Sequence, residues 1–149
     1  VPNVYLWLAG DGPLRADLEG RAEKLGIKPR TRFLGWRRDP ERLFATSDIF
    51  VCPSRHEPMG NVVVESWAQG VPVIAATSIG PKNLIRQGEN GILFPVDDIQ
   101  GLADSVRHLI DHPELKERII VQAVKDYKSN FTEKIVVEKY LKFFERVTI

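Results

Sequence analysis

The sequence predicts an α/β protein with a Rossmann-like, doubly wound parallel sheet. Five short apolar runs alternate along the chain with segments whose apolar residues recur at helical spacing. Because these runs are apolar throughout, we expect strands buried on both faces, as in a parallel sheet covered by helices. The length of 149 residues and the hydrophobic content of 43% fit a single domain over residues 1–149 with one core.

The predicted strands and helices are bounded by turn and capping residues. The strands are expected at residues 4–9, 32–34, 48–53, 73–76 and 91–94. The helices are expected at residues 14–25, from 39–40 onward, and at 61–69, 81–86, 98–110, 113–127 and 132–147. Gly26 and Gly70 are suited to end helices, while Asp39 followed by Pro40 is a typical helix start.

Apolar stripes predict which helix faces are buried. The first helix should bury Leu14, Leu18, Ala22 and Leu25, and the helix from residue 98 should bury Ile99, Leu102, Val106, Leu109 and Ile110. Cys52 lies in an apolar run and is expected in the core. The last helix carries Val136, Tyr140, Phe143, Phe144 and Val147 on one side, an aromatic face that we expect to be exposed and prone to self-association.

Composition excludes several classes of function. The 21 basic and 20 acidic residues nearly cancel, so nothing indicates a nucleic-acid partner. A single cysteine fits a reducing compartment, and no run resembles a membrane span or a signal peptide. We therefore expect a cytoplasmic location, with possible peripheral association at the cytosolic face of a membrane. The start at Val1, almost inside a strand, suggests a piece of a longer protein.

The loop after the third strand is the richest candidate site. Residues 54–60 lead directly into the helix from Asn61, whose first amides, on Gly60, Asn61 and Val62, would form an anion site suited to a diphosphate. Glu57 and Glu65 flank it, and carboxylates accept hydrogen bonds from paired hydroxyls of a sugar or ribose. Alternatively, Asn61 simply caps the helix and the acidic residues complement its dipole.

Two glycines after the first strand are a weaker signal. Gly10 and Gly12 lack the third glycine of a dinucleotide-binding fingerprint, and a tight turn explains them equally well.

The order of several motifs resembles the retaining GT-B glycosyltransferases of family GT4. The resemblance rests on Pro53-Ser54, Glu57-Pro58-x-Gly60, Glu65 and Ala68-x-Gly70-x-Pro72-Val73, in which the two glutamates are separated by seven residues. Further matching blocks are Leu8-Ala-Gly10-Asp-Gly12-Pro13, Phe33-Leu-Gly35, Ser47-Asp-Ile-Phe-Val51 and Gly88-x-Asn90-Gly91, so the likeness runs from about Leu6 to about Ile110. The local sequence around Arg55-His56-Glu57 and Ser78-x-Gly80-Pro81 is similar to that of bacterial enzymes of lipopolysaccharide-core and other envelope-glycan synthesis.

The resemblance implies a nucleotide-sugar donor site and assigns roles within it. Glu57 would be the catalytic carboxylate against the transferred sugar, and Glu65 would hold the ribose. Backbone amides around Met59, Gly60, Asn61 and Val62 would contact sugar and phosphates, and Leu34-Gly35 would border the base, with Gly10 and Gly12 also in the donor site. The donor would be a UDP-, GDP- or ADP-sugar, used without a cofactor or a metal ion.

The sequence also departs from the family pattern. The family's first strand of this domain, its Arg and Lys phosphate clamp and the acceptor-binding N-terminal domain have no counterpart here, so the chain resembles an incomplete C-terminal half of a GT-B fold. We expect the glycan or lipid-linked acceptor to be bound by the missing N-terminal domain and the isolated chain to transfer little sugar. We also expect weak stability or strand-exchanged association, because strands that end near Ala9 and Pro53 would lose a shared neighbour.

Two other functions remain open at this stage. The chain could be a non-catalytic nucleotide-binding fragment. It could also be a glycoside hydrolase using Glu57 and Glu65, although a loop residue and a helix residue around a phosphate site suit that chemistry poorly.

Overall fold

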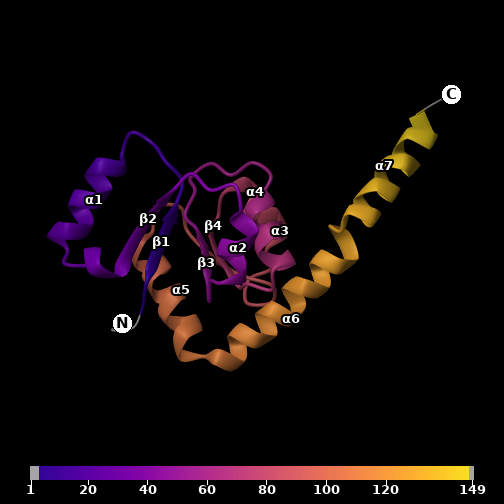
Figure 1. Ribbon diagram of the computed structural model, residues 1–149. Coiled ribbons are helices and arrows are strands. Elements are labelled where there is room, and N and C mark those ends of the chain that lie inside the picture. The colour runs from indigo at the N-terminus through magenta and orange to yellow at the C-terminus, as the bar shows by residue number, and fades with distance from the viewer. Residues whose placement is uncertain (1–3, 148–149) are drawn as a thin grey trace. The chain divides into compact units, whose positions relative to one another are not determined.

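The computed structural model describes residues 4–147 and has the predicted α/β architecture, with parallel strands alternating with helices (Figure 1). The chain forms two compact units, Val1–Pro40 and Glu41–Ile149, and each is considered by itself below. The first unit holds a two-stranded parallel sheet, and the second holds a three-stranded parallel sheet in the order β3-β4-β5. The predicted fold class is confirmed, with the strands distributed over these two sheets.

The first unit is built around one pair of parallel strands. Its elements are β1 (Leu6–Ala9), α1 (Arg15–Lys24), the short 3-10 helix η1 (Lys28–Arg30) and β2 (Thr31–Gly35). Leu6 pairs with Thr31 at the start of the ladder. Within the described residues β1 has a strand neighbour on one side only, and Leu6 and Trp7 are more than 40% exposed. The prediction that this strand is buried on both faces is therefore wrong.

The predicted buried stripe of α1 is also largely exposed. Ala22 is buried, but Leu14 and Leu25 are 64% and 65% exposed and Leu18 is 43% exposed. Leu14 and Leu25 lie just outside the helix, which runs from Arg15 to Lys24, so neither is held on its face.

The second unit contains the remaining elements. They are α2 (Pro40–Ala45, which begins at the boundary), β3 (Phe50–Cys52), α3 (Asn61–Ala68), β4 (Val73–Ala76), α4 (Ile79–Leu84), β5 (Ile92–Phe94), α5 (Ile99–Asp111), α6 (Pro113–Asn130) and α7 (Glu133–Val147). Most lie within a few residues of the predicted ranges. Helix α4 begins two residues before the predicted start and ends at Leu84, and β3 is shorter than predicted.

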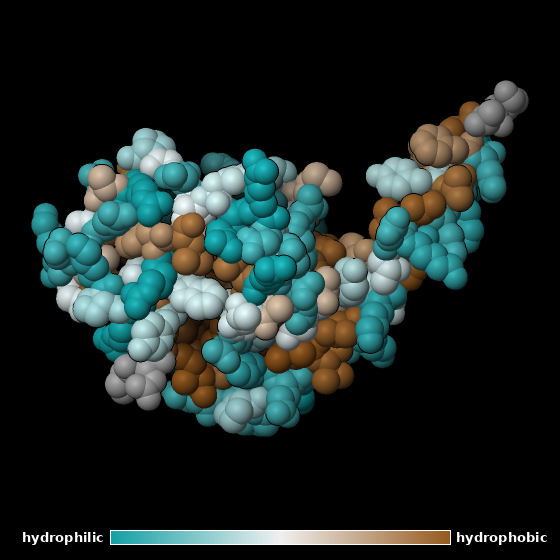
Figure 2. Space-filling view, viewed as in Figure 1, coloured by the Kyte–Doolittle hydropathy of each residue, from teal (hydrophilic) through white to brown (hydrophobic). Residues whose placement is uncertain are grey.

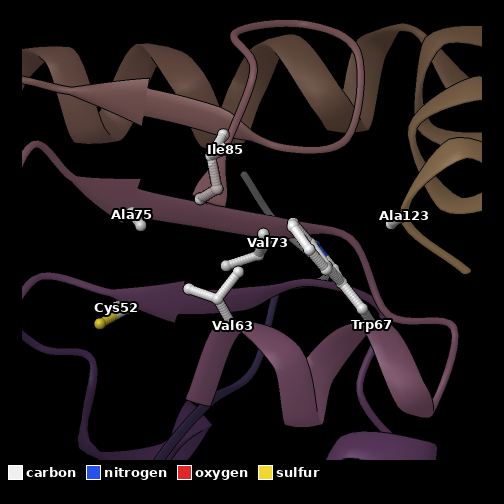
Figure 3. Close-up of a cluster of buried hydrophobic side chains, with 7 residues drawn as sticks. All are labelled: Cys52, Val63, Trp67, Val73, Ala75, Ile85 and Ala123. Atoms are coloured by element: carbon white, nitrogen blue, oxygen red, sulfur yellow. The ribbon is translucent and has the colours of Figure 1, made fainter. Parts of the chain in front are cut away.

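Strand β4 is the centre of the core, and all four of its residues are buried. Its side chains alternate between the two faces of the sheet, as a strand period of two requires. Val73 and Ala75 pack with Val63 and Trp67 of α3 (Figure 3). Cys52 of β3 belongs to the same cluster and is 4% exposed, which confirms its predicted core position.

The opposite face of β4 belongs to a second core cluster. Ile74 and Ala76 pack there with Leu109 of α5 and Ile119 of α6. Helix α6 serves both clusters, since Ala123, four residues after Ile119, lies in the first one. This two-sided packing holds the β3-β4-β5 sheet and fixes the edge at which its strands end.

Helices α5 and α7 leave part of their apolar surface exposed. Ile99 is the first residue of α5 and is 84% exposed, and Ile110 is 38% exposed, so the prediction that both are buried is wrong. Leu109, also predicted to be buried, is 1% exposed, so the prediction is confirmed there. Helix α7 has no buried residue, and apolar side chains lie open among hydrophilic ones along it (Figure 2), which confirms the predicted exposed face.

Candidate functional site

The carboxyl ends of β3, β4 and β5 meet at one edge of the three-stranded sheet. Cys52 pairs with Ala75 and Ala76 pairs with Phe94, so all three strands end at nearly the same level. The segments that follow them, residues 53–60, 77–78 and 95–98, therefore lie at the edge where open α/β sheets bind ligands. Six of the predicted donor-site residues belong to the first of these segments and to the helix that follows it.

Glu57 and Gly60 form the start of α3 together. The Oε1 atom of Glu57 accepts a hydrogen bond of 2.9 Å from the amide of Gly60. Gly60 is the N-cap of α3 and has a left-handed backbone with φ of 76°, a conformation that favours glycine. Two details of the prediction are therefore wrong: Gly60, and not Asn61, caps the helix, and the amide of Gly60 is already bonded to Glu57.

The amides of Asn61 and Val62 lie in the first turn of α3, at the helix start where they were predicted. The first bond inside the helix runs from the amide of Val63 to the carbonyl of Gly60 at 2.9 Å, so Asn61 and Val62 precede it. Amides in the first turn point out of the helix and carry the positive end of its dipole, equivalent to about half a charge. Asn61 is exposed and Val62 is half-buried.

The remaining predicted residues of this unit surround that helix start. Glu57 is half-buried in the loop, whereas Glu65 is exposed on α3, in its second turn. Met59 is 71% exposed. The structure thus brings Glu57, Met59 and the first turn of α3 together, with Glu65 one turn further along the helix.

Sequence reasoning missed an ion pair that joins two loops at this edge. Nε of Arg55 lies 2.6 Å from Oδ1 of Asp97, which connects the segment after β3 with the segment after β5. Asp97 has φ of 64°, the one positive value among the non-glycine residues that the structure describes. Both side chains are more than 60% exposed, so the pair contributes little stability and serves mainly to connect the loops.

The four predicted residues of the first unit also come together. The amide of Gly10 donates a hydrogen bond of 2.7 Å to the carbonyl of Gly35, next to Leu34 at the end of β2. Gly12 donates to Oδ1 of Asp11 at 2.9 Å, as in a local turn. Gly10 thus continues the contact between β1 and β2, and the carbonyl of Gly12 accepts a hydrogen bond of 3.1 Å from the amide of Arg15 at the start of α1. The contact of both glycines with a donor stays a prediction.

Two charged groups that join the α4–β5 connection to α6 have shifted pKa values. Burial raises the pKa of Asp126, but hydrogen bonds from Asn90, Arg86 and Gln122 lower it more, so the net pKa lies below its ordinary value. Hydrogen bonds to Glu89 and Asp126 raise the pKa of Arg86. Asn90 is fully buried, and its Oδ1 also accepts from the amide of Arg86 at 2.7 Å. This network fixes the connection between α4 and β5 against α6.

Residues 4–147 contain neither a candidate metal site nor a candidate membrane-spanning helix. No group of three or more His, Cys, Asp and Glu side chains in that range is arranged to hold a metal ion. None of the helices in the same range combines the length and the apolar content that a membrane crossing needs.

Comparison with known proteins gives a consistent result. A model of the family "Glycosyl transferases group 1" matches residues 1–126. The lipopolysaccharide core biosynthesis glycosyltransferases LpsE and LpsD of Rhizobium meliloti are 39% and 38% identical, and the matches cover 95% and 98% of this chain. They cover only 42% and 43% of the two relatives, so the chain spans about two fifths of their length.

Solved structures agree with this result. Anabaena HepE, crystallised in complex with UDP, is 27% identical, with a TM-score of 0.93 over 99% of this chain and 42% of that chain. WaaG, described as a glycosyltransferase involved in lipopolysaccharide biosynthesis, is 24% identical, with a TM-score of 0.79 over 87% of this chain and 35% of its own, and shares the fold. The chain belongs to the family of group 1 glycosyl transferases.

Proposed function

We propose that this chain is the donor-binding half of a retaining glycosyltransferase that takes a sugar from UDP-sugar and serves bacterial envelope-glycan synthesis. The observation that carries the proposal is the start of α3, where Glu57 holds the capping glycine and two further amides precede the first helical bond. The chemistry of the relatives supports it. HepE has been crystallised with UDP and with UDP-glucose, and LpsE and LpsD are named for lipopolysaccharide core biosynthesis.

The diphosphate of the donor would bind at the amides of Asn61 and Val62. Phosphate oxygens accept hydrogen bonds from first-turn amides, and the positive end of the helix dipole favours their charge. The leaving diphosphate gains negative charge during sugar transfer, so donors fixed in place before the reaction stabilise it most at that moment.

Glu57 would act on the transferred sugar. Its Oε1 already accepts the bond from Gly60, and a carboxylate has about four acceptor sites, which leaves capacity for sugar hydroxyls. Its negative charge also suits a sugar ring that becomes electron-poor as the bond to the diphosphate breaks. Because the same carboxylate bonds Gly60, sugar and phosphate sites would be held in one fixed arrangement.

The other predicted residues would complete the nucleotide site. The exposed carboxylate of Glu65 would accept hydrogen bonds from the ribose hydroxyls, and the backbone at Met59 would border the sugar. In the first unit, considered by itself, Leu34 and Gly35 at the end of β2 would contact the base, and Gly10 and Gly12 stay predicted donor contacts.

The sugar acceptor would be bound outside these 149 residues. Since the relatives are more than twice as long, we infer that a glycan or lipid-linked acceptor is bound by an N-terminal domain, on the cytosolic side of the membrane. The 149-residue chain would then bind donor but transfer little sugar by itself.

A calorimetric titration of the 149-residue chain with UDP, GDP and ADP tests the donor site. We expect UDP to bind with a Kd of about 1 mM or tighter, which corresponds to about 4 kcal/mol, and GDP and ADP to bind at least about tenfold more weakly. Glu65→Ala should lose about tenfold or more of that affinity, since hydrogen bonds to a charged acceptor contribute about 1.5–3 kcal/mol. Glu114→Ala, in the first turn of α6, is the matched control and should bind like the unchanged chain.

The outcomes separate the alternatives. Equal UDP affinity of Glu65→Ala and the unchanged chain would contradict the assignment of Glu65 to the ribose. Tighter binding of GDP or ADP than of UDP would show that the site selects guanine or adenine and not uracil. A full-length relative carrying this domain that binds UDP-glucose but transfers no sugar would favour the non-catalytic binding module.

A further inference from the structure

The loop that carries Glu57 is held against the first turn of α4 by its backbone. The amide of Gly80 donates a hydrogen bond of 2.7 Å to the carbonyl oxygen of Glu57, a residue 23 positions earlier in the chain. Gly80 is buried, and it follows Ser78, the N-cap of α4. The contact joins the segment after β3 to the start of α4, the helix that follows β4.

The absence of a side chain at residue 80 is what permits this contact. A Cβ atom on Gly80 would meet the amide nitrogen of Gly60, the carbonyl carbon of Met59 at 2.6 Å and the carbonyl oxygen of Glu57 at 2.7 Å. All three are backbone atoms, which cannot turn aside as the end of a flexible side chain can. Gly80 does not have a positive φ, so space and not backbone conformation requires glycine here.

Gly60 completes the contact from the other side. A Cβ on Gly60 would lie 3.1 Å from the carbonyl carbon of Gly80 and 2.7 Å from Cδ1 of Leu84. Two glycines from separate segments therefore pack backbone to backbone. The conformation of residues 57–60 depends on the position of residue 80.

We propose that Gly80 is a positioning residue of the donor site, which sets the place of the Glu57 carboxylate and of the first amides of α3 without touching the donor. The proposal rests on the proposed function, because it assumes that Glu57 and those amides bind UDP-sugar. An added methyl group at residue 80 would push the 57–60 segment away from the first turn of α4. A misplacement of about 1 Å can cost on the order of a hundredfold in catalytic rate.

The chain offers a matched control at Gly91. A Cβ there would be crowded as well, 2.9 Å from Cγ1 of Val73 and 3.0 Å from Cγ2 of Ile85, and Gly91 also lacks a positive φ. It lies just before β5, among core side chains and away from residues 57–60. Gly91→Ala should therefore lower stability through crowding but leave donor binding by the folded chain unchanged.

The test compares UDP-glucose affinity and melting temperature for the unchanged chain, Gly80→Ala and Gly91→Ala. We expect both variants to melt at lower temperature, and only Gly80→Ala to lose about tenfold or more of its affinity for UDP-glucose. Equal affinity of Gly80→Ala and the unchanged chain would overturn the inference and leave the donor site intact. Failure of the unchanged chain to bind UDP-glucose at all would overturn the proposed function, and this inference with it.

Hydrogen exchange on the unchanged chain gives an answer even if Gly80→Ala does not fold. Saturating UDP-glucose should slow exchange of the Gly80 amide several-fold, because the donor fixes the loop whose carbonyl accepts its bond. The amide of Gly88, bonded to the carbonyl of Gly91 at 2.9 Å, is the reference and should not change. Equal effects on the two amides, or none at Gly80 while UDP-glucose binds, would overturn the inference.

Discussion

The carboxylate of Glu57 accepts a hydrogen bond of 2.9 Å from the amide of Gly60, the N-cap of α3. The predicted catalytic group therefore also fixes the start of the predicted phosphate-binding helix. In the proposed donor site, the sugar site and the phosphate site would thereby be coupled through a single side chain. A change at residue 57 should affect both the start of α3 and the contact with the sugar.

Two substitutions at residue 57 separate these effects. Glu57→Gln keeps an oxygen that can accept the Gly60 amide but removes the charge, so we expect its melting temperature to stay close to that of the unchanged chain. Glu57→Ala loses the acceptor and should be destabilised by about 0.5–2 kcal/mol, the usual cost of losing a helix-capping bond. Both should bind UDP-glucose more weakly. Equal stability of the two variants in thermal unfolding would contradict a capping role for the carboxylate.

Gly60→Ala should cost more stability than Gly88→Ala. The two glycines have nearly the same left-handed φ, 76° and 74°. A Cβ atom in that conformation should therefore lower the free energy of unfolding by roughly 1–2 kcal/mol at either position. Space around Gly88 is open, whereas a Cβ on Gly60 meets Leu84 and the backbone of Gly80. We expect about 1 kcal/mol or more of additional loss at Gly60 from overpacking, measured by urea unfolding. If Gly88→Ala lost more unfolding free energy than Gly60→Ala, the prediction that crowding adds to the cost at residue 60 would be contradicted.

Asp126 should stabilise the fold above its unfolded pKa. Its folded pKa is lowered, so this contribution is present above about pH 4 and is lost as the pH falls through the folded pKa. The Asp126 side chain is 16% exposed and that of its partner Arg86 is 50% exposed, and Asp126→Asn removes the charge that joins them, so it should cost about 1–3 kcal/mol at pH 7. The difference between the two proteins in unfolding free energy should shrink as the pH is lowered from 5 toward 2. A difference that stays constant over that range would contradict the linkage.

The exposed face of α7 should drive concentration-dependent self-association. Tyr140 and Phe143 are 61% and 57% exposed, and within the described residues β1 and β3 each have a strand neighbour on one side only. Open strand edges and apolar helix faces both favour contact between copies. Replacing Tyr140 and Phe143 by Ser should shift the chain toward monomer in sedimentation velocity, whereas Val121→Ser on α6 should not. A monomer at all concentrations with a sharp, cooperative unfolding transition would contradict this expectation.

The fold could be predicted largely because its signals are local. The apolar run at residues 73–76 forms a fully buried central strand, and Cys52 lies in the core as expected. The stripe at Leu14, Leu18 and Leu25 was misleading, because periodicity reports a face suited to burial and not whether anything covers it.

The candidate site was predictable in its location but not in its bonding. The glutamate spacing and the glycine before α3 indicated where a donor would bind. The bond from Gly60 to Glu57 spans three residues of one loop, but the packing of Gly80 against both depends on contacts between segments about 20 residues apart. Local sequence patterns do not encode such approaches.

Mapping of amide chemical shifts during titration of the 149-residue chain with UDP-glucose tests the central claim most directly. If the diphosphate binds at the start of α3, the largest shifts should occur at Gly60, Asn61 and Val62, with a smaller shift at Glu65. Glu65→Ala should require a higher UDP-glucose concentration for the same shifts. Saturable shifts confined to other parts of the chain, with those amides unmoved, would contradict the donor site proposed here.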